Sequence, residues 1–289
     1  NSDYNNNKSN DNNNSNNSND NNDSNDSNKP ITVGKSIKNT ISYLYRDCFH
    51  HRSSKLLSSW HASIVRKDST KVLCSGVRLN KNWLAMSASC LEKMINAKDI
   101  TAYAATIGSV KVTQTDDRKR LREIKKIYIH PEYRKAWRVN DIALVLMVEL
   151  PQEYRYYSMS PCIMGKGDLE LAIRVFRKGR VTISMSNETS LRVETKVNKV
   201  AAQLCTDGKY MCSRLLRVNE EDFNLRGAPV YVRYGIRESD WGLAALNTGK
   251  MRLTKSGRSI VRKHLPLYAY VNWFEHVIEQ EARWLVTVH

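Results

Sequence analysis

The apolar positions of this chain divide it into three parts of different character. Residues 1–40 are dominated by Asn, Ser and Asp and contain few apolar side chains. Such a segment cannot bury enough apolar surface to offset the entropy lost on ordering, so we predict a disordered tail there. Residues 41–59 are predicted to be a linker that is tethered through Cys48, and residues 60–289 to be one folded domain.

The folded part is predicted to be an antiparallel β protein. From Trp60 onward, short alternating or apolar runs are separated by Gly, Asn, Asp, Lys and Pro at intervals of roughly 8–20 residues, a spacing typical of an all-β barrel or sandwich. The expected strands are residues 60–65, 71–79, 83–88, 124–129, 142–148, 173–176, 191–200, 229–234 and 242–246. Residues 271–285 differ, because their apolar side chains recur at three- and four-residue steps. That period predicts a C-terminal amphipathic α-helix.

Charge indicates the class of partner. The chain has 289 residues and a net charge of +17. Removing Lys8 and the five aspartates of residues 1–28 from the totals of 46 basic and 29 acidic side chains leaves 45 and 24, a net +21 on the remainder. Such a charge favours nucleic acid, an anionic membrane or a sulfated polysaccharide as partner. No apolar run approaches the roughly 18 residues of a membrane-spanning helix, so we expect no transmembrane segment.

Six cysteines favour an oxidising compartment. None of them lies in a C-x-x-C pair, which argues against a zinc ribbon or a thioredoxin-like site, and an even number fits three disulfides. Triplets of the N-x-S/T type add to this picture and are the candidate glycosylation sites: Asn7, Asn13, Asn16, Asn22, Asn25 and Asn187. We therefore predict a secreted glycoprotein, for which nucleic acid is not the expected partner.

Several motifs follow one another in a recognisable order. Cys74-Ser75-Gly76 precedes, by 16 residues between the two cysteines, a strand that ends in Ser87-Ala88-Ser89-Cys90. The later motifs are His130-Pro131-Glu132-Tyr133, Asn140-Asp141-Ile142-Ala143-Leu144, Asn224-Leu225-Arg226-Gly227-Ala228-Pro229, Gly242-Leu243-Ala244-Ala245-Leu246 and Leu267-Tyr268-Ala269-Tyr270-Val271-Asn272-Trp273. In order and spacing they resemble the C-G-G, T-A-A-H-C, H-P-x-Y, N-D-I-A-L, G-D-S-G-G-P, G-I-V-S-W and V-Y-T-x-V-x-x-Y-x-x-W-I segments of the chymotrypsin-like serine proteases.

The resemblance runs from about residue 60 to residue 282 and implies a fold. That fold is all-β, with two six-stranded antiparallel β-barrels and a C-terminal α-helix. It also implies three disulfides, namely Cys74–Cys90, Cys205–Cys212 and Cys48–Cys162, the last in the position that tethers an upstream segment in some family members.

The residues at the implied catalytic positions do not support hydrolysis. Acyl transfer in this family needs a serine nucleophile, a histidine base and an aspartate that orients the histidine. The base position holds Ser89, whose hydroxyl cannot accept a proton near neutral pH. The nucleophile position holds Arg226, which is always cationic. Asp141 is retained, and we expect it to be a buried carboxylate hydrogen-bonded to neighbouring backbone amides. The sequence thus predicts a non-catalytic homologue.

Other residues offer little alternative chemistry. Asn224 and Leu225 replace the Gly and Asp of the family's oxyanion loop, so that loop is altered as well. His50 and His51 are adjacent and point to opposite faces of an extended chain, so we expect no metal site and no cofactor. His130 is expected to be a structural turn residue. The acidic run at 220–222 either pairs with Arg226 or lines a remnant pocket for a basic side chain.

Two functions therefore remain open. The first is a regulatory module that docks on an extracellular protein, such as an active protease or a receptor. The second is a heparin- or glycosaminoglycan-binding protein that acts through clusters of basic residues. The candidate polyanion-binding residues are Arg118, Lys119, Arg120, Arg122, Lys125, Lys126, Lys255, Arg258, Arg262 and Lys263.

Overall fold

A computed structural model describes most of the folded domain. It covers residues 60–68, 72–96, 100–108, 121–149, 161–175, 178–185, 190–196, 210–215, 223–224, 226–234, 241–253 and 260–287. The predicted tail and linker lie outside these residues. The same is true of Cys48, Cys205, Leu225, the acidic run at 220–222, the candidate basic residues Arg118, Lys119, Arg120, Lys255 and Arg258, and all six candidate glycosylation sites.

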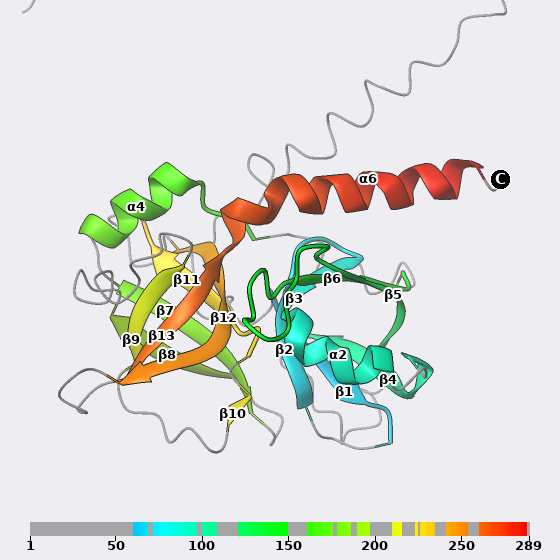
Figure 1. The fold of residues 1–289 in the computed structure, drawn as a ribbon, viewed down its shortest axis with the longest axis horizontal. Helices are drawn as coiled ribbons and strands as arrows, with labels where there is room; N and C mark the ends of the chain where they lie inside the picture. Colours follow the sequence, from blue (N-terminus) through cyan, green and yellow to red (C-terminus); the bar gives the residue numbers. More distant parts are fainter. Residues whose placement is uncertain are drawn as a thin grey trace, which may run out of the picture.

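The first six strands form a closed antiparallel barrel (Figure 1). They are β1 (His61–Arg66), β2 (Val72–Arg78), β3 (Trp83–Met86), β4 (Tyr103–Ile107), β5 (Arg122–Ile129) and β6 (Ala143–Met147), in the order β1-β2-β3-β6-β5-β4. β3 and β6 are buried along their whole length, because one face lines the barrel and the other meets the second sheet. β5 begins with alternation, since Arg122 and Ile124 are buried whereas Glu123 and Lys125 are exposed.

A second, seven-stranded antiparallel sheet follows (Figure 1). Its strands are β7 (Lys178–Met185), β8 (Ser190–Lys196), β9 (Met211–Leu215), β10 (Phe223–Asn224), β11 (Pro229–Arg233), β12 (Trp241–Leu253) and β13 (Ile260–Pro266), in the order β10-β7-β11-β12-β13-β9-β8. Because β7 also pairs with β8, six of these strands close into a ring and β10 extends from β7. The predicted architecture of two six-stranded barrels is confirmed, with β10 as an addition.

The main hydrophobic core lies between the two sheets. Val77, Trp83 and Leu144 of the first barrel share one cluster of buried side chains with Tyr231 and Leu243 of the second. The C-terminal helix α6 (Val271–Thr287) follows the short helix η5 (Leu267–Tyr270) and contributes its buried face to the same cluster. In Figure 1 this helix runs along one side of the molecule, past the first barrel. The predicted C-terminal helix is thus confirmed.

Two further helices were not predicted. Helix α2 (Ala88–Asn96) follows β3, and helix α4 (Lys166–Val175) precedes β7. The expected strand at residues 173–176 is wrong, because residues 173–175 form the last turn of α4. Leu169 and Ala172, three residues apart on one face of α4, are buried against β11 and β12. This spacing is that of an amphipathic helix and not of a strand. A short helix, η2 (Ile100–Ala102), links α2 to β4.

Candidate functional site

The carboxylate of Asp141 is the centre of the candidate site. Its Oδ1 accepts hydrogen bonds from the Ser87 hydroxyl at 2.9 Å and from the Ser89 backbone N–H at 2.7 Å. Its Oδ2 accepts one from the Ser89 hydroxyl at 2.8 Å. Asp141 and Ser87 are buried, with 2% and 1% of their surface exposed. Three donors therefore satisfy a carboxylate that is almost fully withdrawn from water.

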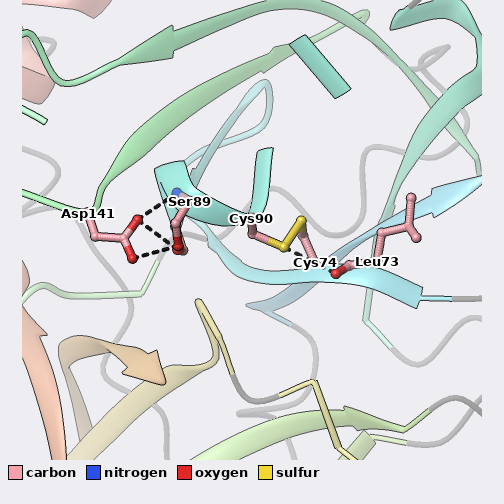
Figure 2. Close-up of a disulfide and its surroundings, with 6 residues drawn as sticks. Leu73, Cys74, Ser89, Cys90 and Asp141 are labelled. Atoms are coloured by element: carbon pink, nitrogen blue, oxygen red, sulfur yellow. Dashed lines mark hydrogen bonds between the residues drawn. A yellow bond between two sulfur atoms is a disulfide. The ribbon is translucent and has the colours of Figure 1, made fainter. Parts of the chain in front are cut away.

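Local structure brings these groups together. Ser89 lies in the first turn of α2, where backbone N–H groups lack partners within the helix. Asp141, two residues before β6, supplies an oxygen to one of them and places a negative charge at the positive end of the helix dipole. The disulfide Cys74–Cys90 ties the same turn of α2 to β2 (Figure 2). The predicted pairing of these two cysteines is confirmed.

The predicted role of Asp141 needs one refinement. We expected bonds to backbone amides, and the Ser89 N–H provides one. The other two donors are side-chain hydroxyls, including that of Ser87, which the sequence analysis did not single out. The Ser87 and Ser89 oxygens are themselves 3.0 Å apart, so the two hydroxyls and the carboxylate form a continuous polar cluster.

Arg226 begins the turn that faces this cluster from the second sheet. The next residue, Gly227, has a φ of 80° and donates its N–H to the Asn247 carbonyl at 2.7 Å. A Cβ atom at Gly227 would collide with the Ser75 carbonyl and lie 3.2 Å from the Ser87 nitrogen. Only glycine fits there, both for its backbone conformation and for its close approach to β2. Arg226 is half-buried beside this contact.

The segment that carries Asp141 is anchored by aromatic residues. The Tyr270 hydroxyl of η5 donates to Asn140 Oδ1 at 2.9 Å. The ring of His130 packs against Tyr270 with a centroid distance of 5.4 Å, and its Nδ1 accepts the Glu132 N–H at 3.2 Å. Burial lowers the pKa of His130. His130 therefore acts in the turn between β5 and β6 as a structural residue, as predicted, and Nδ1 is committed to the backbone.

Tyr133 lies close to the same cluster and was not identified from the sequence. Burial, with the nearby charges of Asp141 and Glu92, raises the pKa of Tyr133 to about 12. A phenol with this pKa stays protonated at neutral pH and cannot serve as a base. Across the described residues, no group of three His, Cys, Asp or Glu side chains converges to hold a metal ion.

Comparison with known proteins identifies the family. The family model described as Trypsin matches residues 49–212, more than half of the 289 residues. The chain belongs to the trypsin family. This membership agrees with the two barrels, the confirmed disulfide and the position of Asp141 beside Ser89.

Three relatives of this trypsin-family chain come from animals. U21-ctenitoxin-Pn1a of Phoneutria nigriventer is 34% identical over 88 residues, which are 30% of this chain and 35% of the relative. Venom peptide isomerase heavy chain of Agelenopsis aperta is 33% identical over 89 residues, 30% of this chain and 36% of the relative. Inactive serine protease scarface of Drosophila melanogaster is 24% identical over 159 residues, 53% of this chain and 23% of the relative. The matches thus span about a third or less of these relatives.

The structure removes Arg122 from the candidate polyanion-binding residues. Only 4% of its surface is exposed, and its guanidinium donates to the carbonyls of Lys81 and Val148 and to Asn82 Oδ1. Burial, helped by the nearby charge of Arg78, lowers the pKa of Arg122 to about 10, so it is still cationic at neutral pH. Arg122 ties the ends of strands β3 and β6 together and does not face solvent.

The other described candidates differ in accessibility. Lys125 is exposed on β5. Lys126 is half-exposed, pairs with Glu281 of α6 at 2.5 Å and lies over the Tyr128 ring. Lys263 of β13 is partly buried and lies over the Tyr210 ring at 4.9 Å from its centroid. Arg262 is also in β13. Lys125 and Lys126 thus belong to the first barrel, whereas Arg262 and Lys263 belong to the second sheet.

The remaining predicted disulfides stay predictions. Cys162 and Cys212 are both disulfide-bonded, and their expected partners, Cys48 and Cys205, lie outside the described residues. Among the helices that the structure describes, none combines the length and the apolar character needed to cross a bilayer.

Proposed function

We propose that this chain is a non-catalytic member of the trypsin family that works by binding a protein partner. The observation that carries the proposal is the hydrogen-bonded cluster of Ser89 and Asp141. At the position of the family's general base, the chain offers a hydroxyl whose proton is already donated to Asp141 at 2.8 Å. A hydroxyl in this arrangement cannot remove a proton from a nucleophile near neutral pH.

Two further observations support the loss of catalysis. Arg226, which precedes the close contact of Gly227 with β2, stands where the resemblance places the nucleophilic serine, and a guanidinium neither attacks a carbonyl nor loses its charge. One of the relatives bears the name inactive serine protease. A protein that keeps the fold while replacing both groups is suited to recognition rather than turnover.

Hydrolysis assays test this proposal. The full chain is incubated with chromogenic peptide esters that carry Arg, Phe or Ala at the cleaved position, with trypsin as positive control. We expect no turnover above that of a Ser89→Ala, Arg226→Ala double variant prepared in the same way. Turnover by the unmodified chain that disappears in the double variant would show that the protein is an enzyme.

We also propose that the protein acts outside the cell, where its partner would be a protease or a receptor. Disulfide bonding of Cys74, Cys90, Cys162 and Cys212 supports an oxidising compartment. Two relatives are named as a toxin and a venom enzyme chain. Peptide mapping of secreted protein, with and without an N-glycosidase, would test export and show which of the candidate asparagines carry glycans.

A second candidate function is binding of a sulfated polysaccharide. The net charge of +17 and the exposed Lys125 favour it, although Arg122 takes no part. The test compares salt elution from heparin with elution from a sulfonate resin of equal charge density. Later elution from heparin, abolished by changing Arg118, Lys119 and Arg120 to Ala, would support a specific site.

The matched control for that test removes the same charge elsewhere. Arg66, Lys67 and Lys81 are exposed and form surface ion pairs. Their joint replacement by Ala should shift elution from both resins equally. If the two triple variants behave alike, the basic charge acts generically and the polysaccharide function is wrong. A protein partner, by contrast, should still bind at high salt through aromatic and Arg anchors.

A further inference from the structure

The turn between β5 and β6 presents an unusually exposed aromatic side chain. Trp137 has 70% of its surface exposed, the largest value among the exposed large apolar residues in the described ranges. A tryptophan buries roughly 150–250 Å² when it is covered, so leaving one in water forgoes a large hydrophobic gain. Tryptophan is enriched among the residues that dominate binding at protein interfaces, so this side chain is a candidate contact for a partner.

The turn is held in a defined shape. The Arg134 N–H donates to the Val139 carbonyl at 3.1 Å, and Arg134 and Val139 form an isolated antiparallel bridge. Arg138 and Asn140 have φ values of 49° and 52°, a conformation that residues other than glycine adopt at a cost. Asn140 also donates to the Glu132 carbonyl at 3.3 Å and accepts from Tyr270. The backbone of this turn therefore loses little conformational entropy when a partner binds.

Basic residues flank Trp137 along the turn. Arg134 and Lys135 are exposed, and Arg138 is half-buried. Lys135 pairs with Glu92 at 3.1 Å, and Glu132, the one acid between residues 131 and 140, contacts Asn140 at 3.3 Å. The turn therefore carries an arginine before and an arginine after Trp137 in the sequence, and Arg and Trp are both enriched in the energetic centres of protein interfaces.

The turn also lies next to the degenerate catalytic site. It ends at Asn140, immediately before Asp141, whose carboxylate holds Ser89. Tyr270 reaches it from the segment that follows the second sheet, so the turn lies near the boundary of the two barrels (Figure 1).

We propose that residues 134–138, the Trp137 turn, form the docking surface for an acidic segment of a protein partner. A leucine or aromatic side chain of that segment covers the indole, and its carboxylates meet Arg134 and Arg138 in bidentate pairs. This inference rests on the proposed function as a binding protein. A protein partner fits better than a sulfated polysaccharide, because a polysaccharide supplies the negative charge without the apolar side chain that the indole requires.

A random 12-residue peptide library displayed on phage, selected against the full chain in 150 mM salt, tests the proposal. We expect selected peptides to combine Asp or Glu with Leu, Phe or Trp. In fluorescence anisotropy, Trp137→Ala should weaken their binding by tenfold or more, and Trp137→Phe should restore most of it. Arg134→Gln should weaken binding severalfold and reduce its salt dependence.

A matched control is available on α4. Leu171 is also a large exposed apolar residue, at 49%, and lies far along the chain from the turn. Leu171→Ala should leave peptide binding unchanged. Unchanged near-ultraviolet circular dichroism of the Trp137 variants, corrected for one indole, confirms that they are folded.

The outcomes separate this proposal from the one on which it rests. If selected peptides bind equally well to Trp137→Ala, or carry no acidic residues, the docking surface is wrong. If Trp137→Ala instead weakens heparin binding tenfold while peptides are unaffected, the surface belongs to a polysaccharide and the proposal is overturned. Ester hydrolysis by the full chain, measured separately, would overturn the non-catalytic function whatever the peptides do.

Discussion

At the scale of single residues, Asp141 has a structural use. It joins β6 to the first turn of α2 through the Ser89 N–H and hydroxyl, and it accepts the hydroxyl of Ser87. The carboxylate and its three donors together stabilise the fold. Removing the acceptor would leave the donors buried without a hydrogen-bond partner. The retention of an acid here is explained without any catalytic duty.

Replacing Asp141 should therefore lower stability. Asp141→Ala leaves the Ser89 N–H and the buried Ser87 hydroxyl without their acceptor, and we expect the free energy of unfolding to fall by about 3 kcal/mol. Asp141→Asn, which keeps one acceptor oxygen, should cost less. Urea denaturation followed by circular dichroism measures both changes. The exposed Asp68 is the control, since Asp68→Ala breaks only a surface ion pair with Arg66 and should cost less than about 1 kcal/mol. Equal losses at both sites would contradict this account.

His61 predicts a specific sensitivity to acid. It is 1% exposed at the start of β1, and burial lowers the pKa of His61 to about 4 in the folded protein, from an ordinary value of 6.5. As the pH falls, His61 is therefore protonated near pH 6.5 in the unfolded chain but only near pH 4 in the folded protein. Stability should be full above pH 6.5 and fall as the pH drops toward 4, by about 3 kcal/mol in total from this residue.

A comparison of variants isolates this contribution. His61→Gln cannot be protonated in this range, so its free energy of unfolding should change less between pH 7 and pH 4 than that of the unmodified chain. His276→Gln, which removes an exposed histidine of α6, is the control for the substitution itself. If His61→Gln retains the full acid sensitivity, carboxylates rather than His61 account for it.

At the scale of elements, α6 makes a polar contact with the first barrel about one turn beyond Val277, on the same face of the helix. Glu281 accepts from the Tyr128 hydroxyl and from Lys126, both on β5, so the outer part of the helix is tied to the first barrel. The Glu281 side chain is only 13% exposed, which makes this pair less screened by solvent than an ordinary surface pair.

Removing that contact should loosen the end of the helix. In Glu281→Gln, hydrogen exchange should quicken in the last two turns of α6, with little change around Phe274, which is fully buried. Glu279→Gln breaks only the i,i+4 pair with Arg283 and provides the control. If the last two turns of α6 exchange no faster in Glu281→Gln than in the unmodified chain, this contact does not hold the helix end.

The elements also show which features a sequence can reveal. Short apolar or alternating runs bounded by turn residues predicted β1, β2, β3, β5, β6, β8, β11 and β12, and missed β4, β7, β9, β10 and β13. The same alternation in β5 puts Arg122 on the inner face with Ile124, a signal that its position in a basic run obscured. The strand expected at 173–176 is a helix, since a short apolar run fits either period until Leu169 and Ala172 are considered with it.

The features of the candidate site that the sequence did not predict depend on contacts between residues far apart in the chain. The family resemblance placed Ser89 and Asp141 together, but not Ser87 Oγ beside Asp141, 54 residues away, or Tyr270 on Asn140, 130 residues away. Such pairs depend on how strands and helices pack, and no local pattern encodes them. The exposure of Trp137 is likewise a property of the folded turn.

At the scale of the whole molecule, the shared core predicts that the two barrels unfold together. Phe274 of α6 is fully buried in the cluster that also contains Trp83 of the first barrel and Tyr231 of the second. Phe274→Ala leaves a cavity at this junction and should lower the free energy of unfolding by about 3–5 kcal/mol. Because one core serves both sheets, tryptophan fluorescence and far-ultraviolet circular dichroism should still report a single, coincident transition. Leu171→Ala, on the exposed face of α4, should cost far less and serves as the control. Two separate transitions in Phe274→Ala would mean that each barrel is stable alone, and that the core between them joins two independent units.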